Sequence, residues 1–546
     1  MSGQLLVLLT FLAGAGVPGW LLASALRGQL WSWNSLGLGA ALGTALATTL
    51  SFITPSGAWE IGGLLYLAAA AAWAFVGKPS LRTGGGGAWP EWVVLGWLGL
   101  CEWMVVASSW WPDGWDTAFH SILAEKILLS GRISHDWMPI EAIPVNYPQG
   151  LHALTAWLSR LSEQGVPVVL QTLHFPFQMG AALATYRLGR DLYGHRGAGL
   201  AAACIYGFCG NWGTFFNYAS WGGLPTEAGC WLFLELLCLS LRPNRRGALA
   251  GGLLLGAIGL CHHLSSLLAA LILVCISLGL LWRKPNGWVA CLRFWWSCVA
   301  VALLAFAFYW IPYLSHAGQL STGSSALRFE DEAATIHPVS MLGWIPCLAG
   351  LAGLLLRGPK NCGTLAVKAW FFSMLFGWLG LDFVYRGVAY WWTGTAFSAF
   401  TPSRWLTIQS YPLAILGGYA VSRLGRRGLA AFCGLAMSFG FYRHYQMARP
   451  IDFPPEQLAF YKKLRELPPN TLLAFAQPPP RAHWLAYLTW HPTLTSPIPA
   501  SEDRRPAIRR RQLFASYAQD RQQLEARLAG EHLTYVIIAP DGQLLR

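Results

Sequence analysis

Residues 110–157 read WWPDGWDTAFHSILAEKILLSGRISHDWMPIEAIPVNYPQGLHALTAW, and this polar stretch lies between long apolar segments. It concentrates acidic side chains in a chain whose formal net charge is +13. Its notable ionisable side chains are Asp113, Asp116, His120, Glu125, Asp136 and Glu141. Because acidic residues are scarce elsewhere in the chain, we expect this stretch to carry the chemistry of the protein.

The apolar residues that follow Asp116 recur at helical spacing and are Phe119, Ile122, Leu123 and Ile127. This pattern predicts a short amphipathic helix that begins near Asp116 and ends at Gly131. A helix of this kind would lie along a membrane surface. Asp116 and His120 are four residues apart, so they would share one face of it.

Asp113 lies in a Pro-Asp-Gly turn about one helical turn before Asp116. Both carboxylates could therefore face one cavity at the membrane boundary. The alternative interpretation is purely structural, with Asp113 as a turn residue and Asp116 as a helix N-cap.

The composition indicates a polytopic membrane protein. The 546 residues are 54% hydrophobic and only 12% charged, and they include 30 tryptophans. In such a protein the excess of Lys and Arg belongs to cytoplasmic loops, so we expect no nucleic-acid partner.

The 12 cysteines show no CxxC spacing and none follows Cys433, so neither a zinc site nor a disulfide framework is indicated.

Apolar windows of about 18 residues or more mark candidate membrane spans. About fourteen are predicted, with an uncertainty of two, near residues 4–26, 36–54, 60–77, 91–109, 166–189, 197–217, 223–241, 247–262, 264–282, 292–315, 338–357, 368–388, 405–423 and 428–443. Clusters of Lys and Arg alternate with loops that lack them, and the basic loops should be cytoplasmic. The loops 110–146, 316–337 and 389–404 and the chain after residue 442 would then lie together outside.

Beyond residue 443 the composition changes abruptly. An apolar run at 471–476, a charged helical stretch at 508–528 and a β-like run at 535–539 follow a proline-rich entry. We therefore predict an all-α polytopic membrane domain over residues 1–443, with its outer catalytic loop at 110–150. A small soluble extracytoplasmic α/β domain would occupy residues 444–546.

His262 and His263 fall in a tight turn between two predicted spans on the outer face. Their imidazoles could donate hydrogen bonds to a phosphate or a sugar. A structural turn is the alternative. Two adjacent histidines do not form a metal site by themselves, so no resident metal is predicted, although nearby carboxylates keep a divalent metal open as an alternative.

Three further candidates lie where outer loops meet spans. Glu227 begins a span after a Gly-Gly loop and is expected either to face a cavity or to be exposed at the interface. Arg404 opens a late span, where its guanidinium could bind phosphate or simply extend to the headgroups. Trp391 and Trp392 supply either a stacking surface for a sugar or an aromatic belt.

Residues 116–157 resemble the first outer loop of the GT-C membrane glycosyltransferases, which use polyprenyl-phosphate-linked sugars. Residues 146–152, NYPQGLH, resemble the Pro-Pro-Leu-Gly-Lys type segment of protein mannosyltransferases and aminoarabinose transferases. A late span opened by an arginine, here Arg404, and a soluble tail are also similar to that superfamily. The chain departs from the pattern because three spans precede the one leading to the loop, the acids are Asp-x-x-Asp, and Gln149 stands in place of the second proline.

The resemblance implies a glycosyltransferase that moves a sugar from a polyprenyl-phosphate-linked donor to a glycan, lipid or protein acceptor on the extracytoplasmic side of a bacterial inner membrane. Asp116, with Asp113 as second choice, would be the catalytic base. Donor phosphate would be bound by Arg404, His262, His263 and His120, and substrate would contact Glu227, Tyr147, Trp391 and Trp392.

Two alternatives remain. A lipid-linked polysaccharide polymerase or ligase would need no aspartate base. A transporter or flippase should show paired repeats and ionisable residues at mid-membrane, and we identify neither in the sequence.

Overall fold

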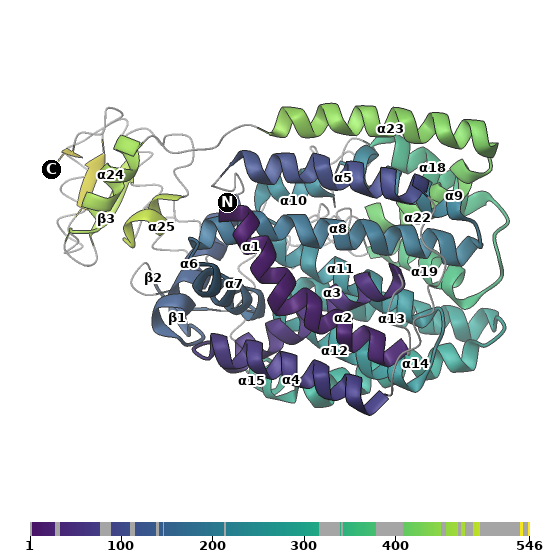
Figure 1. Ribbon diagram of the computed structural model, residues 1–546, viewed down its shortest axis with the longest axis horizontal. Helices are drawn as coiled ribbons and strands as arrows, with labels where there is room; N and C mark the ends of the chain where they lie inside the picture. Colours follow the sequence, from purple (N-terminus) through teal and green to yellow (C-terminus); the bar gives the residue numbers. More distant parts are fainter. Residues whose placement is uncertain are drawn as a thin grey trace, which may run out of the picture.

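Apolar helices form one bundle that contains most of the chain (Figure 1). The computed structural model describes residues 3–27, 33–76, 89–109, 115–137, 141–145, 147–211, 214–315, 339, 342–377, 408–448, 455–467, 471–475, 484–491, 535–538 and 544–545. The helices of the bundle are α1 (Gly3–Phe11), α2 (Val17–Arg27), α3 (Trp33–Ile53), α4 (Ala58–Val76), α5 (Trp89–Ser108), α8 (Val166–Tyr193), α9 (Arg196–Cys204), α10 (Phe215–Trp221), α11 (Leu224–Ser240), α12 (Arg245–Cys261), α13 (His263–Arg283), α14 (Trp288–Ala305), α15 (Ala307–Ser315), α18 (Trp344–Leu355), α19 (Cys362–Phe376), α22 (Ser410–Ser422) and α23 (Gly425–Met447).

Within the described residues, five helical stretches are long and apolar enough to cross a membrane. They are Gly3–Leu26, Leu36–Ile53, Pro90–Ser108, His263–Arg283 and Trp288–Ala305. Each overlaps a span predicted from the sequence, and together they identify an integral membrane protein. The total of about fourteen spans stays a prediction.

Two predicted spans are interrupted. The stretch predicted at 197–217 continues from α9 through a π-helical turn and then stops, because Gly210 adopts an extended conformation (φ −72°, ψ 150°). The chain resumes as the separate helix α10. The stretch predicted at 292–315 breaks at Phe306, which leaves the helical region (φ −113°, ψ 20°) between α14 and α15.

Arg187 and Glu235 form an ion pair inside the bundle. Arg187 of α8 donates to both carboxylate oxygens of Glu235 of α11, at 2.9 and 2.7 Å, and both side chains are almost fully buried. A buried charge without a partner would be costly in such apolar surroundings.

The cysteines are free thiols, buried or half-buried, as their scattered apolar positions predict.

The elements formed by residues 115–162 pack at one end of the bundle (Figure 1). They are helix α6 (Trp115–Ser130), the strands β1 (Asp136–Trp137) and β2 (Glu141–Pro144), and helix α7 (Gly150–Ser162). The two strands pair antiparallel. Helices α6 and α7 pack against each other, and α7 also contacts α1, α3, α8 and α12.

The apolar face of α6, which predicted a helix on the membrane surface, is instead buried against protein. Phe119, Ile122 and Leu123 are buried together with Trp137 and with side chains from the C-terminal part of the chain, namely Tyr461, Leu464, Leu473, Trp484, Tyr487 and Leu488. Ile127 packs on the other side, against alanines of α7. The apolar face of α6 is covered by protein because an amphipathic pattern requires burial and does not specify what supplies it.

The described C-terminal elements are α24 (Pro455–Leu464), β3 (Leu472–Phe475), α25 (Leu485–Thr489), β4 (Tyr535–Ile538) and β5 (Leu544–Leu545). β3 pairs parallel with β4, which pairs antiparallel with β5. The β-like run predicted at 535–539 thus contains a strand, and the apolar run at 471–476 contains another. The predicted helical stretch at 508–528 lies outside the described residues, and α23 continues to Met447, past the boundary expected at residue 443.

Candidate functional site

Helix α6 begins and ends where the sequence predicts. Asp116 lies in its first turn, half-buried, where the helix dipole favours a negative charge. Gly131 follows the last helical residue in the left-handed conformation (φ 63°), and its N–H donates to the carbonyl of Ile127 at 2.8 Å. The helix therefore holds Asp116 at a defined place beside the bundle.

The Gly-Gly loop that the sequence singles out packs directly on this end of α6. Gly222 caps α10 with φ 89°. A Cβ on Gly222 would lie 2.4 Å from the Thr117 hydroxyl, 2.5 Å from the Thr117 amide nitrogen and 3.1 Å from the Asp116 carbonyl carbon. Only glycine fits both this conformation and this close approach, so the loop before Glu227 and the start of α6 belong to one site.

Tyr147 is the centre of a cluster of aromatic and imidazole rings. Its ring centroid lies 5.3 to 6.0 Å from those of Phe119, His120, His152, His262 and His263. The partners come from α6, from α7 and from the turn between α12 and α13. The structure thus brings His120, Tyr147, His262 and His263 together, although the sequence places them more than 140 residues apart at the extremes (263 − 120).

His120 and His152 form a buried pair. Nδ1 of His120 lies 3.0 Å from Nε2 of His152, so one imidazole donates to the other. Burial lowers the pKa of His120 well below its ordinary value, and the neighbouring His152 and His174 lower it further. Burial also lowers the pKa of His152 to about 3. Both rings are therefore neutral at pH 7, and His120 could contact a phosphate only as a hydrogen-bond partner, not as a cation.

The turn between α12 and α13 is as tight as predicted. His262 ends α12 and begins α13, and its Nδ1 lies 2.8 Å from the Ser265 hydroxyl and 3.3 Å from the Ser265 amide nitrogen. The Thr226 hydroxyl is 3.4 Å from the same nitrogen. Gly150 lets α7 start against this turn, because a Cβ there would lie 2.7 Å from the Leu260 Cβ.

Glu227 is fully buried, so exposure at the interface does not explain it. Its carboxylate pairs with Nδ1 of His174 on α8 at 2.6 Å. Within the described residues Glu227 is thus held by another helix of the bundle, next to the hydroxyl of Thr226 that faces His262. Its role toward a substrate stays a prediction.

Four predicted site residues, Asp113, Trp391, Trp392 and Arg404, lie outside the described residues. In the part of the chain that is described, no group of three or more His, Cys, Asp or Glu side chains could hold a metal ion.

Sequence reasoning missed two histidines. His152 stands inside the quoted NYPQGLH segment, but only the fold brings it against His120. His174 stands in a predicted span, where an ionisable side chain is itself a signal of function. That signal could have paired it with Glu227, the nearest acid expected at a span end.

The fold is similar to that of solved membrane proteins. The crystal structure of ArnT from Cupriavidus metallidurans bound to undecaprenyl phosphate matches with a TM-score of 0.53 at 14% identity, over 74% of this chain and 86% of that chain. The Archaeoglobus fulgidus oligosaccharyltransferase in complex with Zn and sulfate matches with a TM-score of 0.49 at 14% identity, over 73% of this chain and 62% of that one. The present chain therefore spans less than two thirds of the oligosaccharyltransferase.

Neither protein-family models nor curated protein sequences match this chain. The ArnT match, which covers most of both chains, identifies a GT-C-like fold. The fold expected from the resemblance at residues 116–157 is confirmed.

Proposed function

We propose that the protein is a membrane glycosyltransferase that uses a polyprenyl-phosphate-linked sugar. The observation that carries this proposal is the cluster of Tyr147 with histidine rings at one end of a GT-C-like bundle, on whose helix α6 Asp116 lies one turn before His120. The ArnT of similar fold is bound to undecaprenyl phosphate, which supports a carrier lipid of this class for the donor.

In the proposed reaction, a hydroxyl or amine of the acceptor attacks the anomeric carbon of the sugar while the bond from that carbon to the phosphate oxygen breaks. Asp116 accepts the proton of the acceptor, and Asp113 is the second candidate for this role. Hydrogen bonds from His262 and His263 and the charge of Arg404 stabilise the departing polyprenyl phosphate. His120 orients the cluster as a neutral partner of His152.

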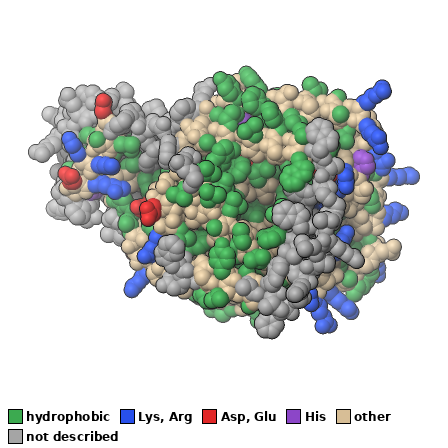
Figure 2. Space-filling model, in the orientation of Figure 1, with side chains coloured by type: hydrophobic (Ala, Val, Ile, Leu, Met, Phe, Trp, Pro, Cys, Tyr) green, Lys and Arg blue, Asp and Glu red, His purple; other side chains and the backbone are tan. Residues whose placement is uncertain are grey.

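We also propose that this end of the molecule is extracytoplasmic. Lys and Arg side chains project from the opposite end of the bundle (Figure 2). Exposed arginines lie at helix ends in the turns between bundle helices, namely Arg196, Arg246, Arg283 and Arg426. Basic residues collect in cytoplasmic loops. In a bacterial inner membrane, the donor would be used on the outer side, with the C-terminal elements above it.

Purified protein in detergent, supplied with a polyprenyl-phosphate-linked sugar and an acceptor, tests the proposal. Asp116→Asn should lower turnover by about 10²- to 10⁴-fold, the usual contribution of general-base assistance, while donor binding persists. Glu456→Gln, at an exposed acid of α24, is the matched control and should retain turnover. Wild-type turnover in Asp116→Asn would refute the aspartate mechanism and favour a polymerase or ligase that needs no carboxylate base.

A further inference from the structure

A cavity of about 410 Å³ lies beside the end of α6 that is remote from Asp116. The cavity is widely open to the surface; its polar wall consists of Lys126, Ser130, Arg132, Ser134 and Asp136, and Trp490 of the C-terminal part also lines it. Its volume is within the range of about 300–1,000 Å³ that is typical of small-molecule sites. Neither the catalytic chemistry proposed above nor the histidine cluster uses these side chains.

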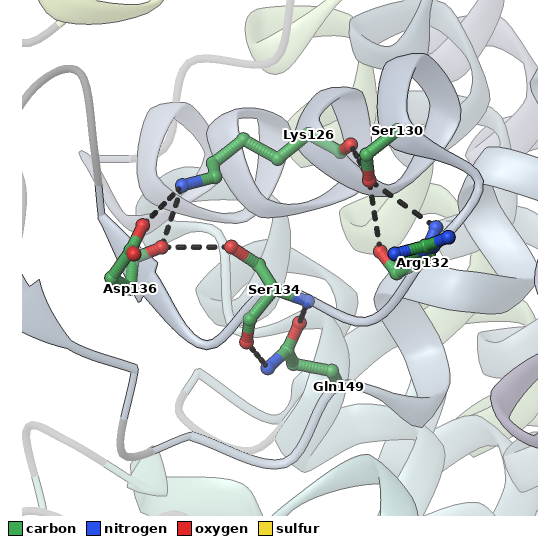
Figure 3. A network of polar contacts seen from close by, with 6 residues as sticks. All are labelled: Lys126, Ser130, Arg132, Ser134, Asp136 and Gln149. Atoms are coloured by element: carbon green, nitrogen blue, oxygen red, sulfur yellow. Dashed lines mark hydrogen bonds and ion pairs between the residues drawn. The ribbon is translucent and has the colours of Figure 1, made fainter.

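The polar wall is fixed by its own hydrogen bonds (Figure 3). The Lys126 ammonium donates to the Asp136 carbonyl at 2.6 Å and pairs with the Asp136 carboxylate at 3.2 Å. The Gln149 side-chain amide donates to the Ser134 carbonyl at 2.6 Å and accepts from the Ser134 N–H at 3.0 Å. The turn after α6 is therefore held in one geometry before any ligand arrives, which reduces the cost of binding.

Ser130 fixes the beginning of the same turn. Its hydroxyl lies 2.7 Å from the Lys126 carbonyl and 3.1 Å from the Arg132 carbonyl, and it accepts from the Arg132 N–H at 3.2 Å. Arg132 is thereby placed at the rim with its side chain exposed. No described carboxylate lies within ion-pair distance of its guanidinium, whereas Lys126 already pairs with Asp136. The cavity has a surplus positive charge at Arg132.

Trp490 is held in an unusual backbone conformation. Its φ is 59°, which a bulky residue rarely adopts, and such outliers occur at ligand clamps when the surroundings enforce them. Arg465 supplies that support by donating to the carbonyls of Leu488, at 2.6 Å, and Tyr487, at 3.3 Å. The Tyr487 hydroxyl donates to Glu125 of α6 at 3.2 Å. These contacts fasten the turn that carries Trp490 to α6.

We propose that this cavity binds an acidic sugar, with the sugar ring against Trp490 and its carboxylate or phosphate at Arg132. The face of an indole suits the apolar C–H face of a sugar ring, and the hydroxyls of Ser130 and Ser134 suit its hydroxyl groups. The guanidinium fork suits a carboxylate or a phosphate. That the sugar is a unit of the acceptor rests on the proposed transferase function, whereas the binding itself does not.

The test is binding to the full-length protein in detergent, measured by calorimetry with glucuronate, glucose 6-phosphate, glucose and inorganic phosphate as probes. Both acidic sugars should bind roughly tenfold more tightly than glucose or phosphate alone, a factor appropriate to one charged hydrogen-bonded contact at an exposed site. Arg132→Ala should abolish the preference for acidic sugars, and Trp490→Ala should weaken binding of every sugar alike. Lys463→Ala, at an exposed cation of α24, should change neither.

Two outcomes overturn the inference. In the first, acidic sugars bind to the wild type no more tightly than glucose does. In the second, the Arg132→Ala variant still binds acidic sugars more tightly than glucose. A transfer assay separates this failure from failure of the proposed function. If the protein transfers sugar but does not prefer acidic sugars, the proposed acidic-sugar site is refuted and the transferase function stands. If the protein shows the expected binding pattern but transfers no sugar, the transferase function is refuted and the acidic-sugar site stands.

Discussion

At the scale of single residues, the site depends on side chains kept neutral by burial. Tyr147 contacts four histidine rings, and two of these, His120 and His152, share a hydrogen bond inside the protein. Neutral imidazoles can donate or accept hydrogen bonds without the cost of burying a charge. In the proposed reaction, neutralisation of the leaving phosphate would therefore fall to Arg404 and not to His120 or His152.

The histidine pair predicts a loss of stability in acid. The unfolded chain takes up protons on both imidazoles below about pH 6.5, while the folded pair does not until the pH reaches its lowered pKa values. Stability should therefore fall as the pH drops below about 6.5, and thermal unfolding in detergent between pH 8 and 5 measures it. His120→Gln should flatten this dependence, and His195→Gln, at an exposed histidine, should not. Equal slopes for His120→Gln and the wild type would contradict the prediction.

At the scale of elements, α6 is held at its beginning by the Gly222 turn and along its apolar face by α24 and α25. Both supports come from parts of the chain distant in sequence. Because α6 carries Asp116, Glu125 and Lys126, its position controls both the proposed base and the cavity beyond it.

Gly222→Ala should impair transfer severely. The new Cβ would collide with the Thr117 backbone, and a left-handed conformation costs a residue with a Cβ roughly 1–2 kcal/mol. Gly194→Ala is a matched control, since Gly194 has φ 65° but open space around it. Both variants should unfold at lower temperature, and only Gly222→Ala should lose turnover at a temperature where each remains folded. Similar turnover in the two would show that the contact with α6 is dispensable.

Leu464→Ala tests the support from the C-terminal elements. The side chain is 1% exposed in the cluster that covers α6, and a buried leucine truncated to alanine typically costs about 2–5 kcal/mol. The variant should become sensitive to limited proteolysis between residues 450 and 546 and should lose transfer activity. The neighbouring exposed residue provides the control, Lys463→Ala, which should resemble the wild type in both assays. Unchanged proteolysis of Leu464→Ala would show that this packing contributes little.

At the scale of the whole molecule, the bundle separates a basic end from an end that carries the candidate site (Figure 2). The helices α6 and α7 and the C-terminal elements share the second end (Figure 1). A donor lipid in the bilayer and an acceptor above it could meet only where a membrane-embedded bundle and an extramembrane surface adjoin. This arrangement is the physical basis for expecting transfer at the membrane boundary.

The proposed orientation predicts which cysteines a membrane-impermeant maleimide can reach in intact cells. Glu456→Cys, on exposed α24, should be labelled from outside, and Arg246→Cys, at the exposed start of α12, should be labelled only after the membrane is opened. The wild type gives the baseline for its twelve native cysteines. Labelling of Arg246→Cys in intact cells, with Glu456→Cys protected, would invert the topology and place every proposed site residue in the cytoplasm.

The sequence by itself determined features that depend on neighbouring residues along the chain. Of about fourteen spans predicted from apolar runs, five coincide with long apolar helices in the part of the chain that the structure describes; Gly131 marked the end of α6, and the His262-His263 pair marked a turn between helices. Each of these is encoded within a few turns of helix, because span length, helix termination and tight turns respond to local composition. The β-like run predicted at 535–539 likewise contains the strand β4.

Only the tertiary structure decided which partners those elements meet. His120 pairs with His152 across 32 residues, and Glu227 pairs with His174 across 53. The apolar face of α6 met side chains more than 330 residues further on (461 − 123), where a membrane surface had been expected. An apolar or ionisable side chain specifies that it must be buried or paired, but the identity of the partner follows from packing over the whole chain, which no local pattern contains.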